Sequence, residues 1–182
     1  MKAIKDMALG ELAAYICTHL RMNGIPCVLS GGACVTIYSE NRYQSYDLDF
    51  IEQEYTPREK LRVVLSGLGF SEEHRYFRHE DTDYFIEFPA GPLSVGSEPV
   101  KKIDEMTFDT GTLTLLSPTD CVKDRLAAYY HWDDLQALDQ AKMVARNYEI
   151  DLAEIRRWSE VEKQLEKFER IKDELKSESV PT

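Results

Sequence analysis

The sequence predicts an α+β fold in which helices flank a mixed β-sheet and a helical segment follows at the C-terminal end. Over residues 1–116, apolar residues at helical spacing alternate with short apolar runs that end at glycine or proline turns. From Ser117 onward, apolar residues recur at helical spacing. We therefore expect a mixed core over residues 1–116, a helical region over 117–175 packed on it, and a disordered tail over 176–182.

The composition predicts a globular chain with an acidic surface. The 182 residues are 43% hydrophobic and 30% charged, and the formal net charge is −11. This charge repels phosphate backbones, whereas a nucleotide that enters with divalent cations is compatible with it. No segment has the apolar length of a signal peptide or a membrane span, so we expect a cytoplasmic protein without a membrane partner. The cysteines lie in apolar runs without metal-binding spacing, which favours buried free thiols: Cys17, Cys27, Cys34 and Cys121.

The first expected elements are a helix and a strand. Apolar residues at helical spacing extend over residues 9–20, and Asn23-Gly24 ends the helix. Cys27–Leu29 is a short apolar run typical of a strand, and it stops at Ser30-Gly31-Gly32. The composition of residues 33–39 fits either a helix or a strand.

The middle of the chain predicts strands around one more helix. Residues 47–51 begin with the polar and apolar alternation of a half-buried strand. Pro57 begins an amphipathic helix that ends near Gly67 and Gly69. Further strands are expected at residues 84–88, 93–96, 100–108 and 111–116.

Ser117-Pro118-Thr119-Asp120 predicts a helix start, because a capping hydroxyl precedes a first-turn proline and an acid. Helical spacing then continues toward the end of the chain, where a thin apolar stripe crosses a charged segment. The stripe indicates a helix that packs on its own domain or pairs with a second copy in a homodimer; its members are Val161, Leu165, Phe168 and Leu175.

Asp47 and Asp49 are the strongest candidates for chemistry. On a strand, two residues of this spacing leave the same face, roughly 6–7 Å apart along the backbone, while Leu48 and Phe50 point into the core. Neighbouring carboxylates repel each other unless a cation lies between them, and a hard cation such as Mg²⁺ prefers oxygen ligands. A solvated strand end can carry the same pair without any metal.

A third acid, Glu87, lies in the middle of the expected strand at residues 84–88. A carboxylate among apolar neighbours needs a partner, because burial of an unpaired charge is costly. That partner is either a structural Arg or Lys, or a metal ion shared with Asp47 and Asp49.

Gly31-Gly32 directly follows an expected strand. Glycines at this position allow the backbone to approach a phosphate closely, and the free N–H groups of a helix start favour anions. Ser30 would add a hydroxyl donor. A plain tight turn is the alternative explanation for the two glycines.

Order and spacing connect these features. The segments Val28-Leu29-Ser30-Gly31-Gly32-Ala33 and Arg42-Tyr43-Gln44-Ser45-Tyr46-Asp47-Leu48-Asp49-Phe50 place phosphate donors before metal ligands. This pattern resembles the DNA polymerase beta-like nucleotidyltransferases, in particular their minimal, AbiEii-type toxin-like branch. The resemblance covers residues 26–51, although Arg42 lies one residue farther from the acidic pair than in that branch.

The resemblance implies a reaction and a set of residues. Asp47, Asp49 and Glu87 would be catalytic and would hold Mg²⁺, as one or two ions, while a nucleoside monophosphate moves from a nucleoside triphosphate to an acceptor hydroxyl. Either Lys123 or Arg125 would offer a basic side chain to the triphosphate. The remaining nucleotide-binding residues would be Ser30, Gly31, Gly32, Arg42 and Ser45.

Two other functions stay open. The displaced Arg42 and the lack of a basic residue at Trp132-Asp133-Asp134, where the family has one beside an acid, favour a degenerate binding or regulatory protein of the toxin–antitoxin type. An acidic cleft would instead suit a cationic small-molecule acceptor, as in aminoglycoside-modifying nucleotidyltransferases. The acceptor is open among a small molecule, a protein and tRNA.

Overall fold

The computed structural model describes residues 2–176 and contains a mixed seven-stranded sheet with strand order β3-β4-β5-β2-β1-β9-β8, which confirms the expected α+β class. A separate hairpin pairs β6 with β7. The strands are β1 (Cys27–Ser30), β2 (Asp47–Glu52), β3 (Ser71–Glu73), β4 (Tyr76–His79), β5 (Thr82–Glu87), β6 (Ser94–Val95), β7 (Glu98–Pro99), β8 (Ile103–Phe108) and β9 (Gly111–Leu116).

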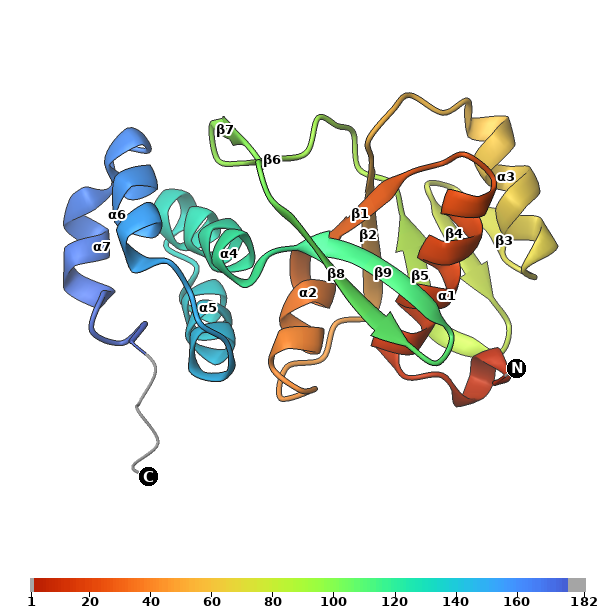
Figure 1. Cartoon of the computed structure of the whole chain (residues 1–182), viewed down its shortest axis with the longest axis horizontal. Coiled ribbons are helices and arrows are strands. Elements are labelled where there is room, and N and C mark those ends of the chain that lie inside the picture. The colour runs from red at the N-terminus through yellow and green to blue at the C-terminus, as the bar shows by residue number, and fades with distance from the viewer. Residues whose placement is uncertain (1, 177–182) are drawn as a thin grey trace.

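The helices divide into two groups along the long axis of the molecule (Figure 1). The first three helices, α1 to α3, lie along the sheet, and the last four, α4 to α7, gather at one end of the molecule. After a short 3₁₀ turn, η1 (Ile4–Asp6), the helices are α1 (Leu9–Met22), α2 (Gly31–Tyr38), α3 (Arg58–Gly67), α4 (Pro118–Trp132), α5 (Leu135–Asn147), α6 (Leu152–Val161) and α7 (Leu165–Ile171).

The centre of the sheet combines parallel and antiparallel pairing. Strand β2 runs antiparallel to β1 and parallel to β5, while β1 runs parallel to β9. Strands β3 and β8 form the two edges, each in an antiparallel pair with its neighbour. The parallel register places Glu87, the last residue of β5, beside Asp49 in the middle of β2.

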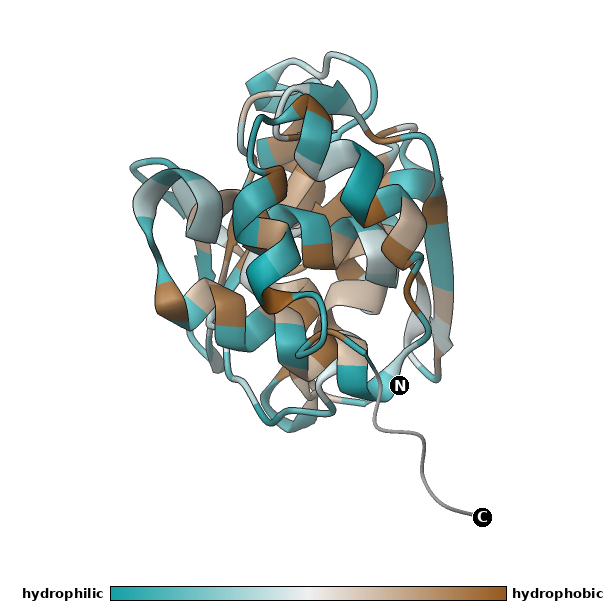
Figure 2. Ribbon diagram, turned by 90° about the vertical axis from the view of Figure 1, so that its left-hand side faces the viewer, coloured by the Kyte–Doolittle hydropathy of each residue, from teal (hydrophilic) through white to brown (hydrophobic). Residues whose placement is uncertain are grey.

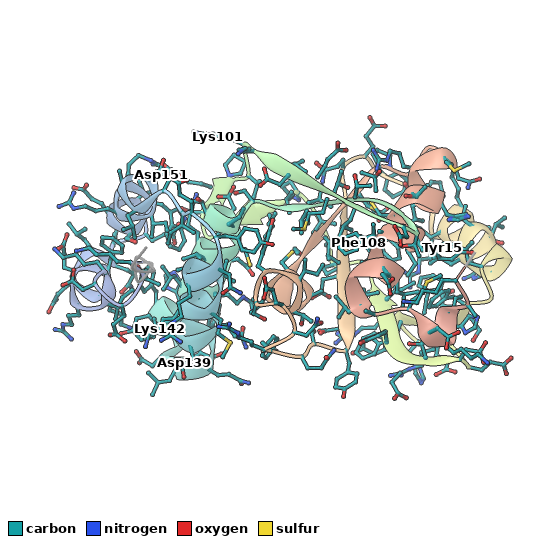
Figure 3. The ribbon with its side chains drawn as sticks, turned by 60° about the horizontal axis from the view of Figure 1, so that its bottom comes forward. Tyr15, Lys101, Phe108, Asp139, Lys142 and Asp151 are labelled. Atoms are coloured by element: carbon teal, nitrogen blue, oxygen red, sulfur yellow. The ribbon has the colours of Figure 1, made fainter. Side chains whose placement is uncertain are left out.

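One hydrophobic cluster joins the sheet to both groups of helices. Leu48 and Phe50 of β2 are completely buried in it, as expected from the alternation of that strand. At Gly10, α1 approaches β8 so closely that an added Cβ would lie 2.8 Å from the ring of Phe108, which is labelled in Figure 3. At the helical end, hydrophobic and hydrophilic stretches alternate along the helices, as amphipathic helices require (Figure 2).

The first C-terminal helix begins where the sequence predicts. Ser117 caps α4, since its Oγ accepts a hydrogen bond from the N–H of Asp120 at 3.2 Å. Phe168 is buried within the same chain, whereas Val161 is exposed and does not complete the expected stripe. The four cysteines are buried and free. Within residues 2–176, no helix has the length and apolar character needed to cross a membrane.

The structure differs from the sequence-based expectations at several places. Of residues 33–39, which fitted either class, all but Ser39 lie in helix α2, whose residues 33–36 are all buried. Strands β3 and β4 were not expected, and residues 93–96 contribute only the two-residue β6 outside the main sheet. Glu87 is the last residue of β5 and not a mid-strand residue. Residues 177–182 of the expected disordered tail lie outside the described part of the chain.

Candidate active site

The three candidate acids lie on neighbouring strands and share one face of the sheet. The parallel register of β2 and β5 pairs Asp49 with Glu87 and Asp47 with Phe85. Residues paired in register project to the same side, and Asp47 and Asp49 are two apart, so all three carboxylates leave one face. Leu48, between the two aspartates, is completely buried on the opposite face.

Gly31 gives Asp49 the space for its carboxylate. Helix α2 begins directly after β1, and Gly31 has a φ of +67°, in the left-handed region that favours glycine. An added Cβ would lie 2.6 Å from Oδ2 of Asp49. Ser30 lies in register with Asp49 and donates a hydrogen bond from Oγ to its backbone oxygen at 3.3 Å. The turn from β1 to α2 therefore needs glycine both for its backbone conformation and for contact with the acid.

Burial and like charge act together on Asp49. Its pKa is raised to about 7, mainly by desolvation and then by the neighbouring carboxylates of Asp47 and Glu87, in that order of size. Asp124 adds a smaller contribution in the same direction, while Arg125 acts against it. The cluster carries more negative charge than its own cations neutralise, which favours a bound cation.

Ser45 and Thr36 position Asp47. Ser45 is buried, and its Oγ donates a hydrogen bond to Oδ1 of Asp47. The N–H of Ser45 donates in turn to Oγ1 of Thr36 in α2, at 2.9 Å. An added Cβ on Gly32 would lie 3.1 Å from the Ser45 hydroxyl. Ser45, expected to bind the nucleotide, thus orients a carboxylate in this structure, and Thr36 is a supporting residue that the sequence did not reveal.

A cavity of about 270 Å³ borders Asp49. On one side it is lined by Ser30 and Gly31 at the start of α2, and on the other by Asp124 and Arg125 of α4. Its remaining wall is mainly apolar: Ile51, Pro89, Ala90, Pro92, Leu93, Ser94 and Leu116. Arg42 is exposed and does not line this cavity.

Of the two basic residues that the sequence left open, Arg125 lines the cavity next to Asp49. Its guanidinium donates to Oδ2 of Asp124 at 3.1 Å and to Oε1 of Gln140 at 3.3 Å. Asp124 is a fourth acid near the site that the sequence did not single out.

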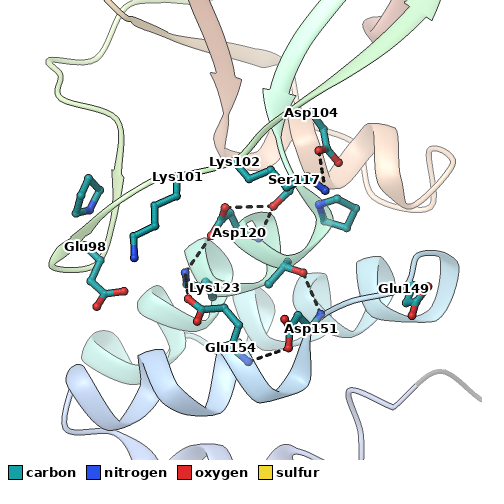
Figure 4. A pocket seen from close by; sticks show the side chains of 13 residues that line it. Glu98, Lys101, Lys102, Asp104, Ser117, Asp120, Lys123, Glu149, Asp151 and Glu154 are labelled. Carbon is teal, nitrogen blue, oxygen red and sulfur yellow. Dashed lines mark hydrogen bonds and ion pairs between the residues drawn. The ribbon is translucent and has the colours of Figure 1, made fainter.

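Lys123 belongs to a different cavity, of about 420 Å³, which Figure 4 shows from close by. Its Nζ lies 3.0 Å from Asp120 and 3.2 Å from Glu154, and the lysine is almost completely buried. This arrangement is that of a structural ion pair between α4 and α6 and does not place the ammonium beside Asp49.

Glu87 has a cationic partner within the chain. Oε1 of Glu87 lies 3.2 Å from Nε of Arg75, which is on the turn between β3 and β4. Because neither of these strands was expected, no sequence signal pointed to Arg75. Within residues 2–176, no three Asp, Glu, His or Cys side chains converge into a ligand set for a metal ion as they stand. Two of the three carboxylates have partners within the chain: Glu87 contacts Arg75, and Asp47 accepts from Ser45.

Comparison with known proteins shows the fold. No protein-family model matches the chain, and no curated protein matches its sequence. Among solved structures, it is similar to an antigenic nucleotidyltransferase-like protein from Paracoccidioides brasiliensis, with a TM-score of 0.63, 11% identity and coverage of 93% of both chains. Two structures of the antibiotic-resistance factor ANT(2'')-Ia, one in complex with adenylyl-2''-tobramycin, give TM-scores of 0.49 and 0.48 at 12% identity, over 92% and 86% of this chain and 94% of theirs. The protein therefore has a nucleotidyltransferase-like fold.

Proposed function

We propose that the protein is a Mg²⁺-dependent nucleotidyltransferase, which moves a nucleoside monophosphate from a nucleoside triphosphate to an acceptor hydroxyl. The observation that supports this most is the register of β2 and β5, which pairs Asp49 with Glu87 on the face that Asp47 shares. A nucleotidyltransferase-like fold agrees with the proposal.

The donor set fits a hard divalent cation. Three carboxylates on one face supply oxygen ligands, and the pKa of Asp49, raised to about 7, reflects a charge that a divalent cation would compensate. Asp47 and Asp49 would hold the ion that meets the triphosphate, and Glu87 would hold the ion next to the acceptor. When bound, Mg²⁺ would stabilise negative charge on the entering and leaving oxygens of an in-line displacement.

The residues around the acids have separate tasks in this proposal. Ser45 keeps Asp47 oriented, and Gly31 leaves room for Asp49 and for the phosphates beside the start of α2. Arg125, on the far side of the cavity, would neutralise charge on the leaving pyrophosphate. In the reaction, the acceptor hydroxyl loses its proton to solvent, its oxygen bonds to the α-phosphorus, and the bond from that phosphorus to the bridging oxygen breaks to release pyrophosphate.

Two labels on the triphosphate test the proposed reaction. The protein is incubated with Mg²⁺, a cell extract that supplies acceptors, and each nucleoside triphosphate labelled at either the α- or the γ-phosphate. Nucleotidyl transfer predicts that the α-label alone enters an acceptor and that Asp49→Asn prevents this. Transfer of the γ-label, or unchanged α-label incorporation by Asp49→Asn, would contradict the proposed function.

A nucleotide-binding protein without transferase activity is the second candidate. The observation that favours it is the ion pair between Arg75 and Glu87, which neutralises the third carboxylate. Stabilisation of the fold by nucleoside triphosphate and Mg²⁺, without label transfer to any acceptor, would support this alternative. The AbiEii-type branch, a toxin–antitoxin role and the identity of the acceptor stay predictions.

A further inference from the structure

The third carboxylate of the site is held by a cation from the chain itself. Arg75 reaches Glu87 across the end of the β4–β5 ladder, with 3.2 Å between Nε and Oε1. The side chain of Glu87 is 21% exposed, whereas that of Arg75 is 70% exposed. The pair thus joins a largely covered acid of the site to an arginine that solvent reaches freely.

The backbone around Arg75 is anchored, while its side chain is on the surface. His74, with a φ of +59°, and Arg75 form the turn between β3 and β4. Arg58 donates from Nη2 to the carbonyl oxygen of Arg75 at 3.0 Å and from Nε to Glu72 at 2.7 Å, which ties the turn to α3. The guanidinium of Arg75 lies 4.8 Å from the centre of the Tyr76 ring. Its side chain can therefore swing away from Glu87 without moving the hairpin or opening the core.

The guanidinium and a divalent cation would compete for Glu87. Both need the same carboxylate oxygens, and their positive charges would repel each other if both lay against Glu87. In the metal-free protein Oε1 of Glu87 faces Arg75, and among residues 2–176 no three acidic, His or Cys side chains are grouped as metal ligands.

We propose that Arg75 is an internal counter-cation, which neutralises Glu87 in the metal-free protein and releases it when a divalent cation binds the three carboxylates. Arg75 is a positioning residue in this scheme, and it sets the metal concentration at which the site fills. The inference rests on the metal site of the proposed function.

Binding of Mn²⁺ to the full chain tests this role without any assay of activity. Free Mn²⁺ is followed by electron paramagnetic resonance while the protein is titrated. Removal of an exposed counter-charge in Arg75→Gln should tighten Mn²⁺ binding about two- to fivefold, and Arg75→Lys should bind close to the wild type. Arg78→Gln is the matched control, because Arg78 lies on the same sheet face, 4.8 Å from the centre of the Phe85 ring, but pairs with Glu73. This control should not change the affinity.

The same substitution in the Glu87→Gln variant tests the contact between Arg75 and Glu87 directly. If Arg75 acts through Glu87, Arg75→Gln should give no gain when Glu87→Gln is already present. The inference is overturned if Arg75→Gln leaves Mn²⁺ binding unchanged or weaker, if Arg78→Gln gains as much, or if the gain persists in the Glu87→Gln background. Loss of binding in Asp49→Asn together with no effect of Arg75→Gln would overturn only this inference. Absence of binding in the wild type, or unchanged binding in Asp49→Asn, would overturn the proposed metal site and the role of Arg75 with it.

Discussion

Replacement of Asp49 by asparagine should stabilise the metal-free protein while it removes metal-dependent function. The pKa of Asp49 lies at about 7 instead of its ordinary 3.8, mainly because the carboxylate is desolvated and secondarily because Asp47 and Glu87 repel its charge. Each pH unit between these values corresponds to about 1.4 kcal/mol, so the ionised carboxylate lowers the free energy of unfolding by roughly 4 kcal/mol at most. A buried amide also needs hydrogen-bond partners, and we therefore expect a net gain of about 2 kcal/mol.

The size of the stabilisation by Asp49→Asn depends on pH. The pKa of Asp49 is higher in the folded protein than in the unfolded one, so the folded state binds more protons. The wild type therefore has its full free energy of unfolding below about pH 4 and loses part of it as the pH rises toward 7. The gain of Asp49→Asn should therefore be small at pH 5 and complete at pH 8. For a chain of this length, about 2 kcal/mol corresponds to a rise in Tm of roughly 4–8 °C.

Thermal and urea unfolding in EDTA at pH 5 and pH 8 measure this difference. Asp83→Asn is the matched control, because Asp83 is an exposed aspartate on β5 and should give no gain. A variant Asp49→Asn that is less stable than the wild type at pH 8, or whose gain is the same at both pH values, would refute the reasoning that burial and repulsion destabilise this carboxylate.

Three further predictions concern the surroundings of the site. Gly31→Ala should destabilise the fold by more than about 1 kcal/mol and weaken Mn²⁺ binding, because its Cβ would meet Asp49. Gly67→Ala, in helix α3 with no atom from outside that helix near its Cβ, should not destabilise the fold in urea unfolding, and an equal loss of stability would count against this explanation for Gly31. Lys123→Met should lower stability by about 3–5 kcal/mol, since it removes the cationic partner of the buried Asp120, whereas Glu154 keeps Arg157. An unchanged urea midpoint would argue against a structural role. Arg125→Gln should weaken nucleoside triphosphate binding about tenfold in calorimetry, and an affinity equal to that of the wild type would exclude it as the triphosphate contact.

Local signals in the sequence were sufficient for much of the fold. The stripe of α1, the apolar run of β1 and the cap at Ser117 each specify an element through neighbouring residues, and all three elements form as predicted. Residues 33–39 gave no period because α2 is buried on several sides, so its class depends on packing and not on pattern.

The parts that the sequence did not reveal depend on contacts between distant segments. Strand β3 is short and polar, and β4 is a four-residue strand in which only Phe77 is buried. The two strands are held by the pairing of β3 with β4, the pairing of β4 with β5 and the ion pair of Arg58 with Glu72. Without them, Arg75 could not be placed beside Glu87. Lys123 and Arg125 are two residues apart and therefore roughly 200° apart around a helix, and only the packing of α4 decides which of them faces Asp49.

Calorimetric binding of a non-hydrolysable nucleoside triphosphate tests the central claim most directly, because it asks whether the carboxylates bind a nucleotide through a divalent cation. We expect wild-type binding in Mg²⁺ that EDTA abolishes and that Asp49→Asn weakens by at least about tenfold, in a variant that is folded and at least as stable as the wild type. Asp83→Asn should bind like the wild type. Binding that is unaffected by EDTA, or that Asp49→Asn leaves intact, would contradict the account.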